Sequence, residues 1–464
     1  MVAPCHCGGF RVLRTARIAP STNAAGHPLP ERAVPLTFLD AMWLHSPPVE
    51  RVFFYRLGSG DVDDVLSRLS DSLSRVLHDF YPLAGRLRRT PGKSNRYELF
   101  YQPGDGVSFT VAEHDGVGEV DELATDEPRD VAEIAPLVPE LPKDGAVLAV
   151  QATVLPPACR GIALGVTVHH AACDGSSSTH FLHAWAAICA GAAVPSPPVI
   201  NRTCIRERED IYDMMTATTE RDQNMFRSPD VVDGKLLATF TLSKDNLQSI
   251  KDTVAGEAAR RATPPPRCTS IVATFAVTWH CYIRSAELVN EAEETRNDCR
   301  VHLLFATDNR ARMEPRVPDK YLGTCVGGCF ASAPNKDVAA TGADGLFTTC
   351  SAIAAAIEEG TLYHADYWDW CLEHGKELRS IDAGPPLSVA GSPRFRVYDV
   401  DFGFGRPVKV EIVSVAKTGA MSVAEARGGS GGIEVGIALP PERMERLRRC
   451  FHDAVAGLAV TSNQ

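Results

Sequence analysis

A proline-rich stretch near the middle of the chain, Gly191 to Pro198 (GAAVPSPP), is the feature that most limits how this sequence can fold. It follows an Ala-rich helical pattern and leads into the charged run NRTCIRERED, so it predicts a long exposed connection. The chain has 464 residues, which is enough for two domains of about 100 to 200 residues each. We therefore predict an N-terminal domain (residues 1–190), a crossover (191–230) and a C-terminal domain (231–464).

Helical and strand periodicities are mixed on both sides of this crossover. Val62–Asp79 repeats apolar residues at helical intervals, Gly161–Val168 is a continuous apolar strand pattern, and Phe181–Ala190 is typical of a helix. Near the C-terminus, AMSVAEAR and IEVGIAL alternate as strands around GGSGG, and Pro441–Val455 predicts a closing helix. The pattern predicts an α/β or mixed α+β fold with two domains of similar size.

Composition excludes several classes of protein. The net charge of -11 argues against a protein that binds nucleic acid or an anionic membrane, because both need a basic surface. The 14 cysteines are scattered without paired C-x-x-C motifs, which predicts reduced thiols. The opening residues lack the apolar core of a secretory signal, and no apolar run approaches a membrane span, so we predict a cytoplasmic protein. Cys5, His6 and Cys7 could contribute to a metal site, but a frayed terminus is the favoured interpretation, and we predict no metal.

Two familiar active-site signatures are present only in part. The glycines of DFGFGRP lack the third glycine and the following helix of a dinucleotide fingerprint, so a nucleotide site is unsupported. The residues Gly428–Gly432 (GGSGG) match the G-x-S-x-G of serine hydrolases, but that motif needs a helix after it, and here a strand pattern follows. A hairpin turn is the alternative.

The segment His169–Gly175 (HHAACDG) is a polar loop that ends an apolar strand. Adjacent histidines on extended backbone point to opposite faces, so only one of the two can enter a shared cavity. His170 is suited to accept a proton near neutral pH, and Asp174 can orient the base or fix the loop. A buried histidine with a turn-forming Asp-Gly is the alternative, and a metal site built from His169, His170, Cys173 and Asp174 is another. Spacing alone leaves these readings open.

The HHAACDG segment resembles the H-x-x-x-D-G signature of the BAHD family of plant acyl-CoA-dependent acyltransferases, and Asp401–Gly405 (DFGFG) resembles that family's DFGWG. The stretches Leu36–Asp40 (LTFLD) and Tyr81–Leu87 (YPLAGRL) are also similar to the family, and the resemblance extends from about residue 10 to the C-terminus. It implies two similar-sized domains built like chloramphenicol acetyltransferase, with a channel between them.

The resemblance also implies roles for individual residues. His170 is the general base that deprotonates an acceptor, whose attack on a CoA thioester proceeds without an acyl-enzyme. Asp174 holds the loop through an ion pair, and Arg310 matches the arginine that supplies the partner. Asp401, Gly403 and Gly405 belong to a structural motif, in which Phe404 replaces the usual Trp and loses an indole N–H.

Two further stretches favour one branch of the family. Tyr321–Cys325 (YLGTC) is similar to the YFGNC motif of enzymes that acylate anthocyanin and flavonoid glucosides, with Leu322 and Thr324 in place of Phe and Asn. Gly391–Phe395 resembles the GSPRF of the same branch, where many hydroxycinnamoyl-transferring relatives carry Trp at the position of Ser392.

A malonyl carboxylate calls for arginine, and Arg394 and Arg312 are the candidates, although either could be a solvated or structural arginine. The remaining candidates are Ser392, Thr37 and Phe38 for substrate binding, and Arg260, Arg261, Arg267 and Ser270 for CoA binding, where simple solvation of the basic residues is the alternative.

From this resemblance we expect a monomeric enzyme that transfers malonyl from malonyl-CoA to a sugar hydroxyl of a flavonoid, anthocyanin or other phenolic glucoside. Acyl-CoA is a co-substrate, and no cofactor is expected. Transfer of a coumaroyl or caffeoyl group to a glucoside or an amine is the second candidate. A non-catalytic binding protein with the same fold is the alternative of a different class.

Overall fold

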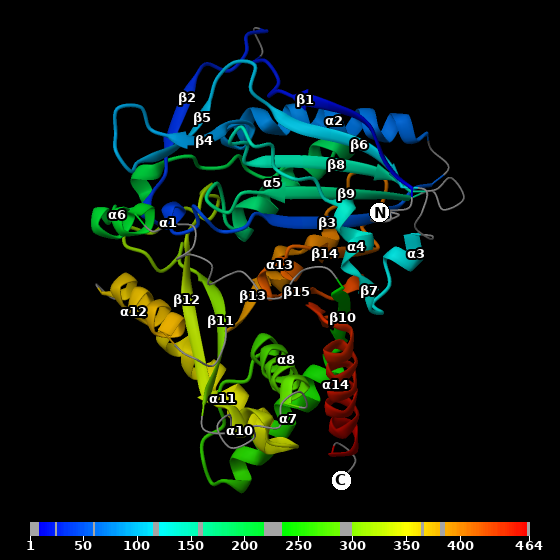
Figure 1. The fold of residues 1–464 in the computed structure, drawn as a ribbon, viewed down its shortest axis with the longest axis vertical. Helices are drawn as coiled ribbons and strands as arrows, with labels where there is room; N and C mark the ends of the chain where they lie inside the picture. The colour runs from blue at the N-terminus through cyan, green and yellow to red at the C-terminus, as the bar shows by residue number, and fades with distance from the viewer. Residues whose placement is uncertain are drawn as a thin grey trace, which may run out of the picture. The chain divides into compact units, whose positions relative to one another are not determined.

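The structure is a computed structural model that describes residues 9–23, 26–58, 61–114, 120–155, 161–217, 234–287, 299–362, 366–380 and 386–461. The chain forms two compact units (Figure 1). The first consists of Met1–Asn224, Glu314–Cys325 and Phe395–Ser414, and the second of Met225–Met313, Val326–Arg394 and Val415–Gln464. These units differ from the sequential division that we expected, because the chain returns twice from the second unit to the first.

One of these returns places the DFGFG segment in the first unit instead of the C-terminal part. The reason is a strand pairing between distant parts of the chain. Strand β14 (Lys409–Ile412) pairs antiparallel with β3 (Val49–Arg56), with Lys409 opposite Phe54. The hydrophobic pattern of the sequence gives no sign of this long-range pairing.

The main sheet of the first unit has the strand order β1-β6-β8-β9-β3-β14. Its remaining strands are β1 (Phe10–Ile18), β6 (Val107–His114), β8 (Leu148–Val154) and β9 (Gly161–Val168). A second sheet has the order β2-β5-β4, formed by β2 (Arg32–Pro35), β5 (Tyr97–Tyr101) and β4 (Arg86–Arg89). The predicted strand Gly161–Val168 is confirmed. Every residue of β9 is buried, and β9 pairs with β3 on one side and with β8 on the other.

Two long helices pack together in the first unit, behind the strands in Figure 1. Helix α2 (Val62–Asp79) has the predicted bounds, and the Asp61 carboxylate caps it by accepting the Asp63 N–H. Helix α5 (Gly175–Ala190) begins six residues before the predicted start at Phe181. The first six residues of the helix, GSSSTH, are polar and show no helical spacing of apolar residues. The Asp174 cap stabilises this first part of the helix. The shorter helices are α1 (Phe38–Ala41), α3 (Val120–Leu123) and α4 (Val131–Ile134).

The predicted crossover contains more structure than an exposed connection. Residues 191–194 are exposed, as expected, but the chain then forms a 3₁₀ turn at Arg202–Cys204 and helix α6 (Glu209–Ala217). Ile211 and Tyr212 of this helix are buried. Residues 218–233, which include the rest of the predicted crossover, lie outside the described residues.

The second unit has a sheet that includes strands in the order β12-β11-β13-β15-β16-β10. These strands are β12 (Val326–Pro334), β11 (Arg300–Asp308), β13 (Leu387–Gly391), β15 (Met421–Glu425), β16 (Ile433–Leu439) and β10 (Leu236–Leu242). Its helices are α7 (Lys244–Arg260), α8 (Ser270–Glu287), α10 (Asn335–Ala339), α11 (Ala343–Gly360), α12 (Tyr367–Ser380), α13 (Val415–Thr418) and α14 (Pro441–Thr461).

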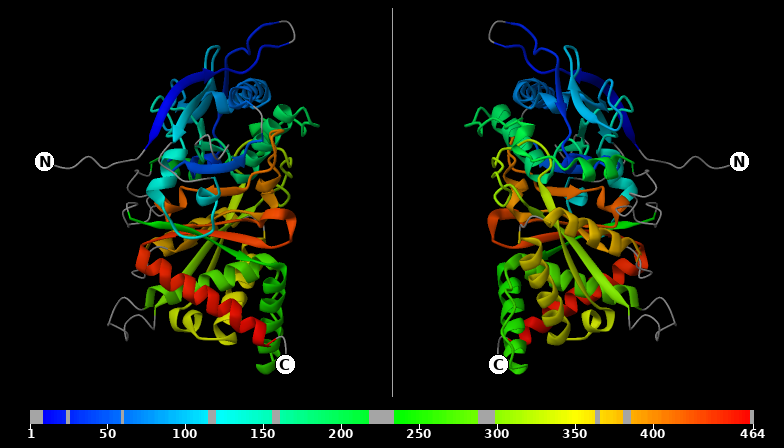
Figure 2. Two further views of the ribbon diagram at one scale, coloured as in Figure 1. Left: turned by 90° about the vertical axis from the view of Figure 1, so that its right-hand side faces the viewer. Right: turned by 90° about the vertical axis from the view of Figure 1, so that its left-hand side faces the viewer.

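The C-terminal predictions are confirmed in the second unit. Strands β15 and β16 pair antiparallel, with Met421 opposite Ile437, so GGSGG is part of their hairpin connection. Helix α14 begins at Pro441 as predicted, extends to Thr461, and packs against α7 and α8 (Figure 2). A hydrophobic core that includes Trp279 and Met444 lies between these helices and the sheet.

Candidate active site

The loop His169–Gly175 leads from the end of β9 to the start of α5. The His169 N–H donates to the Val147 carbonyl at 2.9 Å, so the loop is tied to the chain at the start of β8 as it leaves the sheet. The Ala172 N–H then donates to the His169 carbonyl at 3.0 Å, which closes a tight turn around His170. The sheet and this turn therefore fix the backbone of His170.

His170 is the side chain of this loop that is best placed for proton transfer. Its ring stacks on the Trp43 indole, with the ring centroids 3.9 Å apart and the planes inclined by 13°. The residue is half-buried, and Nδ1 is buried and makes no hydrogen bond of ordinary geometry within the described part of the chain. Burial lowers the pKa of His170, while the charge of Asp174 and the main-chain carbonyl of His170 oppose this change. The ring is therefore neutral at neutral pH and can accept a proton.

His169 has a different environment from its neighbour. Its Nδ1 accepts the Ala171 N–H at 3.2 Å, so the ring takes part in the turn itself. Burial, followed by His170 and His45, lowers the pKa of His169 to about 4. His169 is therefore a neutral turn residue, as expected if only one of the two histidines serves as the base.

Asp174 holds the far end of the loop. Its Oδ1 accepts the Ser177 N–H at 2.9 Å, which caps α5, and its Oδ2 accepts the Cys325 N–H at 3.0 Å. The carboxylate is almost fully buried, and the N-terminus of α5 stabilises its negative charge. The geometry therefore agrees with a role for Asp174 in holding the loop.

The glycine after Asp174 is required by a close approach. A Cβ atom on Gly175 would lie 2.7 Å from two carbons of the Phe395 ring. Phe395 belongs to the GSPRF stretch, and its carbonyl lies 3.0 Å from Nε2 of His183 on α5. The start of α5 and the residues around Phe395 are thus packed together within the first unit.

The YLGTC segment binds the same loop. The Asp174 N–H donates to the Gly323 carbonyl at 3.3 Å. The Ser177 hydroxyl lies 2.9 Å from the Tyr321 carbonyl and 3.0 Å from that of Gly323. The Thr324 hydroxyl donates to the His170 carbonyl at 3.2 Å. Two stretches that the sequence analysis connected only by family resemblance are thus one hydrogen-bonded structure.

The LTFLD stretch forms the buried support of this structure. Thr37 caps α1, and its hydroxyl donates to Asp40 Oδ2 at 2.8 Å. Phe38 is buried, and its N–H donates to Glu207 Oε1 at 2.8 Å. Substrate binding by Thr37 and Phe38 stays a prediction. Trp43, just after α1, is the residue of this region that contacts the His170 ring, and the sequence analysis missed it.

The DFGFG segment has local contacts of its own. Asp401 Oδ1 accepts the N–H groups of Gly403 and Gly405, at 2.8 and 3.1 Å. Phe402 is fully buried, and the half-buried Phe404 meets the Tyr55 ring edge-on at a centroid distance of 5.1 Å. These contacts are typical of a structural turn.

The predicted arginines and Ser392 lie in the second unit. Arg394 is exposed, and its main-chain N–H donates to the Ser392 hydroxyl at 3.3 Å. Arg312 is also exposed, and its guanidinium donates to the Asp308 carbonyl. Arg310 is buried and pairs with Asp308 Oδ1 at 3.1 Å, and its predicted pairing with Asp174 stays a prediction.

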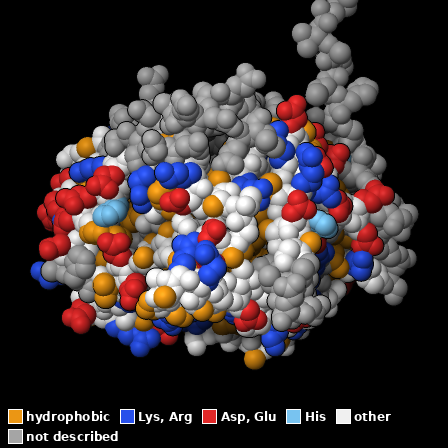
Figure 3. Space-filling model, turned by 90° about the horizontal axis from the view of Figure 1, so that it is seen from below, with side chains coloured by type: hydrophobic (Ala, Val, Ile, Leu, Met, Phe, Trp, Pro, Cys, Tyr) orange, Lys and Arg blue, Asp and Glu red, His pale blue; other side chains and the backbone are white. Residues whose placement is uncertain are grey.

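The predicted CoA-binding residues gather at the loop between α7 and α8. Arg260 and Arg261 both pair with Glu257 and with Asp344, at 2.5 to 3.0 Å. Their positive charge is therefore largely compensated. Arg267 is exposed, and Ser270 accepts a hydrogen bond from Lys251, a further cation that the sequence analysis missed. On the face shown in Figure 3, basic side chains form small separate groups among acidic ones. CoA binding at this loop stays a prediction.

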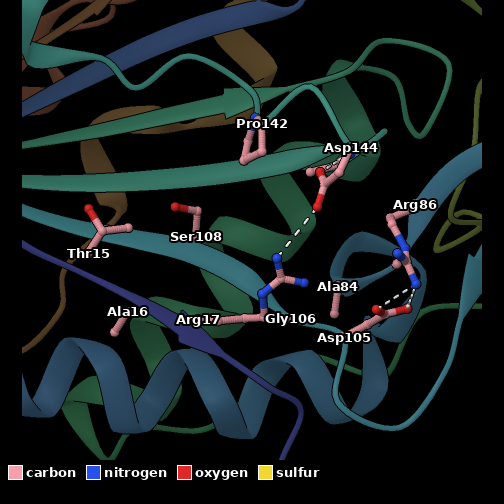
Figure 4. Close-up of a pocket in the computed structure, with 12 residues that line it drawn as sticks. Thr15, Ala16, Arg17, Ala84, Arg86, Asp105, Gly106, Ser108, Pro142 and Asp144 are labelled. Carbon is pink, nitrogen blue, oxygen red and sulfur yellow. Dashed lines mark hydrogen bonds and ion pairs between the residues drawn. The ribbon is translucent and has the colours of Figure 1, made fainter.

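A hollow of about 250 Å³ lies elsewhere in the first unit, among β1, β4, β6 and the loop before β8 (Figure 4). Two arginines project into it, and each has an acidic partner: Arg17 pairs with Asp144 at 3.5 Å, and Arg86 with Asp105 at 2.9 Å. None of the hollow's lining residues belongs to the His170 loop.

The described part of the structure does not support the alternative hypotheses of a metal site and a serine hydrolase. Within the described ranges, no group of three or more His, Cys, Asp and Glu residues could hold a metal, so a metal site at His169, His170, Cys173 and Asp174 is unsupported. Cys5, His6 and Cys7 lie outside the described residues. The GGSGG segment connects two strands and is followed by no helix, so it is not the strand-to-helix turn of a serine hydrolase. No described helix is long and apolar enough to cross a membrane.

Comparison with known proteins identifies relatives along the whole chain. The Transferase family model matches residues 12–453. Phenolic glucoside malonyltransferase 2 of Arabidopsis thaliana is 30% identical, over 96% of this chain and 99% of that protein. The coumaroyl-CoA:anthocyanidin 3-O-glucoside-6''-O-coumaroyltransferase 2 of the same plant is 29% identical, over 94% of this chain and 95% of that protein. The malonyl-coenzyme A:anthocyanin 3-O-glucoside-6''-O-malonyltransferase of Dahlia pinnata is 28% identical, over 96% and 97% respectively.

Solved structures share the fold at lower sequence identity. Vinorine synthase superposes with a TM-score of 0.70 and 19% identity, over 94% of this chain and 96% of that one. Fusarium graminearum TRI101 in complex with coenzyme A and deoxynivalenol gives a TM-score of 0.63 and 16% identity, over 90% and 97%. These neighbours confirm the predicted two-domain fold of the chloramphenicol acetyltransferase type.

Proposed function

The chain belongs to the Transferase family, the BAHD acyltransferases, and from this premise we propose that His170 is the general base in acyl transfer from a CoA thioester to a hydroxyl group. The observation that carries this proposal is the state of the His170 ring. It is stacked on Trp43 and held on a loop whose backbone is fixed by the sheet, α5 and the YLGTC segment, and burial favours its neutral form by lowering its pKa. A neutral imidazole in a fixed orientation is what proton abstraction requires.

The proposed reaction has two bond-changing steps. Nε2 of His170 takes the proton of the acceptor hydroxyl as its oxygen attacks the thioester carbonyl, which gives a tetrahedral intermediate. The intermediate then expels the CoA thiolate, which takes the proton from the imidazolium. His170 is thereby regenerated without an acyl-enzyme. General-base catalysis of this kind contributes about 100 to 10,000-fold in rate.

We propose malonyl as the acyl group and a sugar hydroxyl of a phenolic glucoside, such as a flavonoid or anthocyanin glucoside, as the acceptor. Relatives named malonyltransferases of phenolic glucosides and anthocyanins support this, at 28 to 31% identity. The exposed Arg394 also supports it, because a guanidinium can bind a free carboxylate through two parallel hydrogen bonds. Ser392, small and half-buried beside it, favours a short acyl group over an aromatic one.

A panel of donors and acceptors tests this proposal. Malonyl-, acetyl- and coumaroyl-CoA would each be offered with cyanidin and quercetin glucosides, and release of free CoA thiol would be followed. We expect turnover that requires both substrates and is fastest with malonyl-CoA. Fastest turnover with coumaroyl-CoA would contradict malonyl transfer and favour coumaroyl transfer, the second candidate. No turnover with any pair would favour a binding protein.

Coumaroyl transfer is the second candidate for one specific reason. The two relatives named coumaroyl-CoA:anthocyanidin glucoside coumaroyltransferases are 29% identical to this chain, close to the 30% of the phenolic glucoside malonyltransferases. Overall identity therefore does not separate the two donors, whereas Arg394 and Ser392 favour malonyl.

The role of Arg394 can be tested within the same assay. The substitution Arg394→Leu removes the guanidinium and should raise KM for malonyl-CoA far more than KM for acetyl-CoA, which has no carboxylate. Arg312→Leu is the matched comparison, because Arg312 is also exposed but donates to a main-chain carbonyl. Equal changes in KM for both donors in the Arg394 variant would rule out its role in binding the carboxylate.

A further inference from the structure

Thr324 connects the backbone of His170 to a buried carboxylate. The residue is fully buried. Its main-chain N–H donates to Asp40 Oδ1 at 2.8 Å, and its hydroxyl donates to the His170 carbonyl oxygen at 3.2 Å. Thr324 therefore contacts the main chain of the general base and reaches the reaction only through His170.

The carboxylate at the other end of this connection is firmly held. Asp40 is fully buried, and its Oδ2 accepts the Thr37 N–H at 2.9 Å and the Thr37 hydroxyl at 2.8 Å. Arg202 Nε lies 3.8 Å from the same oxygen and compensates the charge. A buried charge with these partners is costly to move, so Asp40 gives Thr324 a fixed attachment point.

The neighbours of Thr324 along the chain are fixed as well. The Cys325 N–H donates to Asp174, and the Gly323 carbonyl accepts the Asp174 N–H. Arg202 also donates to the Tyr321 hydroxyl at 2.8 Å. The backbone on both sides of Thr324 is thus tied to the loop that Thr324 supports, and its hydroxyl is held towards one acceptor, the His170 carbonyl.

We propose that Thr324 is a positioning residue for His170, which it serves by fixing the His170 carbonyl and, through it, the ring against Trp43. This inference rests on the proposed role of His170 as the base. For Nε2 to accept a proton, the neutral ring must carry its hydrogen on Nδ1, which is buried. A carbonyl oxygen has two lone pairs, so the His170 carbonyl can accept the Thr324 hydroxyl and still face its own Nδ1–H. The effect of this carbonyl on the pKa of the ring agrees with such an arrangement.

The residue that makes this hydrogen bond departs from the related family pattern. The related YFGNC pattern has Asn at the position of Thr324. A hydroxyl offers one donor on a short, stiff side chain, whereas an amide offers two donors on a longer one. The hydrogen bond to the His170 carbonyl is therefore assigned to the hydroxyl of Thr324.

The test compares Thr324→Val with Thr324→Ser. Valine has nearly the same shape and keeps the main-chain bond to Asp40 but removes the hydroxyl, whereas serine keeps the hydroxyl. We expect Val to lower kcat by about tenfold, the equivalent of one hydrogen bond, with KM for both substrates within about twofold of the wild type. We expect Ser to retain kcat within about threefold. An equal loss of kcat in the two variants, or a loss confined to KM, would overturn the proposal.

A second readout does not depend on turnover. In protein labelled with ¹⁵N-histidine, NMR spectra report the tautomer and the pKa of each ring. We expect the His170 signals to change in the Val variant and to remain near wild type in the Ser variant, while those of His183, on α5, stay constant in both. If the Val variant unfolds, Thr324→Ala gives the same comparison with Ser. An unchanged His170 titration in the Val or Ala variant would overturn the proposal.

These outcomes also separate the inference from the proposed function. If the chain transfers no acyl group, the wild type shows no turnover, but the NMR comparison still shows whether Thr324 holds the ring. If turnover survives the loss of His170, the general-base assignment fails whatever Thr324 does. Asp174, whose charge acts on the pKa of the ring, and the Asp40–Arg202 pair, which holds the Thr324 main chain, are unaltered in every variant.

Discussion

The two segments that resemble family signatures, the His169–Gly175 loop and the Asp401–Gly405 segment, are held in place in different ways. The loop is hydrogen-bonded to residues far away in the sequence: its N–H groups donate to the carbonyls of Val147 and Gly323, and it accepts hydrogen bonds from Thr324 and Cys325. In the Asp401–Gly405 segment, Asp401 itself accepts two N–H groups within four residues. One distant hydrogen bond, from Arg68 to the Phe402 carbonyl at 3.2 Å, and the packing of Phe402 and Phe404 on Tyr55 complete its support.

This difference separates catalysis from stability. Long-range hydrogen bonds fix the backbone of the half-buried His170 and so the orientation of its ring. Proton transfer needs a fixed ring, whereas a structural turn does not. The turn hydrogen bonds, the Arg68 contact and the packed rings of the Asp401–Gly405 segment stabilise a turn but present no side chain suited to proton transfer. Substitutions in the loop should therefore affect turnover first, whereas substitutions in the Asp401–Gly405 segment should affect stability first.

The largest expected effect is that of His170→Gln. Glutamine keeps a polar side chain of similar length but cannot act as a base near neutral pH. We expect kcat to fall by about 100 to 10,000-fold, with little change in the melting temperature, as measured by CoA release and thermal unfolding.

His169→Gln is the matched control for this prediction. The His169 ring accepts a turn hydrogen bond from Ala171, which a glutamine oxygen can also accept. We expect kcat to fall by less than about tenfold. Similar losses in the two variants would contradict the assignment of the base to His170.

The next effect in size is that of Asp174→Ala, which should lower both stability and kcat. It removes the cap of α5 and leaves the buried Cys325 N–H without its acceptor, so we expect a loss of about 2 to 4 kcal/mol in the free energy of unfolding. Asp174→Asn keeps one oxygen for the cap and should lose about half as much. A loss in the Asn variant as large as in the Ala variant would show that both carboxylate oxygens are needed, one for the α5 cap and one for the Cys325 N–H.

In the Asp401–Gly405 segment, Gly403→Ala should reduce stability without affecting kcat. Gly403 has φ +88°, and a Cβ atom there would lie 2.8 Å from Arg68 Nη2 and 3.0 Å from the Ala190 Cα. We expect a loss of about 2 to 3 kcal/mol, measured by urea unfolding. Gly405→Ala has similar backbone strain at φ +110° but no atom within 4 Å of the new Cβ, and should lose about 1 to 2 kcal/mol. A larger effect on kcat than on stability at Gly403 would remove the distinction between the two segments.

The smallest expected effect is that of Phe404→Trp, which restores the residue typical of the family. Phe404 is half-buried beside Tyr55, so an indole can extend towards solvent. We expect the free energy of unfolding to change by less than about 1 kcal/mol and kcat to stay within about twofold. A gain of several kcal/mol would mean that the missing indole N–H had left an important hydrogen bond unmade.

Local features of the fold could be predicted from the sequence, and long-range ones could not. Apolar spacing predicted both bounds of α2 and the whole of β9, and alternation predicted the β15–β16 hairpin. The first turns of α5 were missed because the run after Asp174 is polar, although an aspartate three residues before Ser177 is a recognisable cap. The return of β14 to pair with β3 has no local signal, so the sequence suggested a simpler division of the chain.

The candidate site shows the same limit. Motif resemblance identified His170 and Asp174, but their surroundings come from separate parts of the chain. Trp43 could have been noted as a tryptophan close to a recognised stretch, whereas Thr324 was noted only as a departure from a pattern. Arg202 compensates the charge of the buried Asp40 because the fold brings the 3₁₀ turn next to α1. No spacing in the sequence indicates this pairing.

The pH dependence of kcat/KM tests most directly whether a neutral His170 is the base. This parameter reports the ionisation of the free enzyme, and burial lowers the pKa of His170 below its ordinary value of about 6.5. Because the base must be unprotonated, the decline in activity should be centred below pH 6.5 and should reach about tenfold per pH unit below the lowered pKa. A decline already centred above pH 6.5, or activity that rises as the pH falls, would contradict this account.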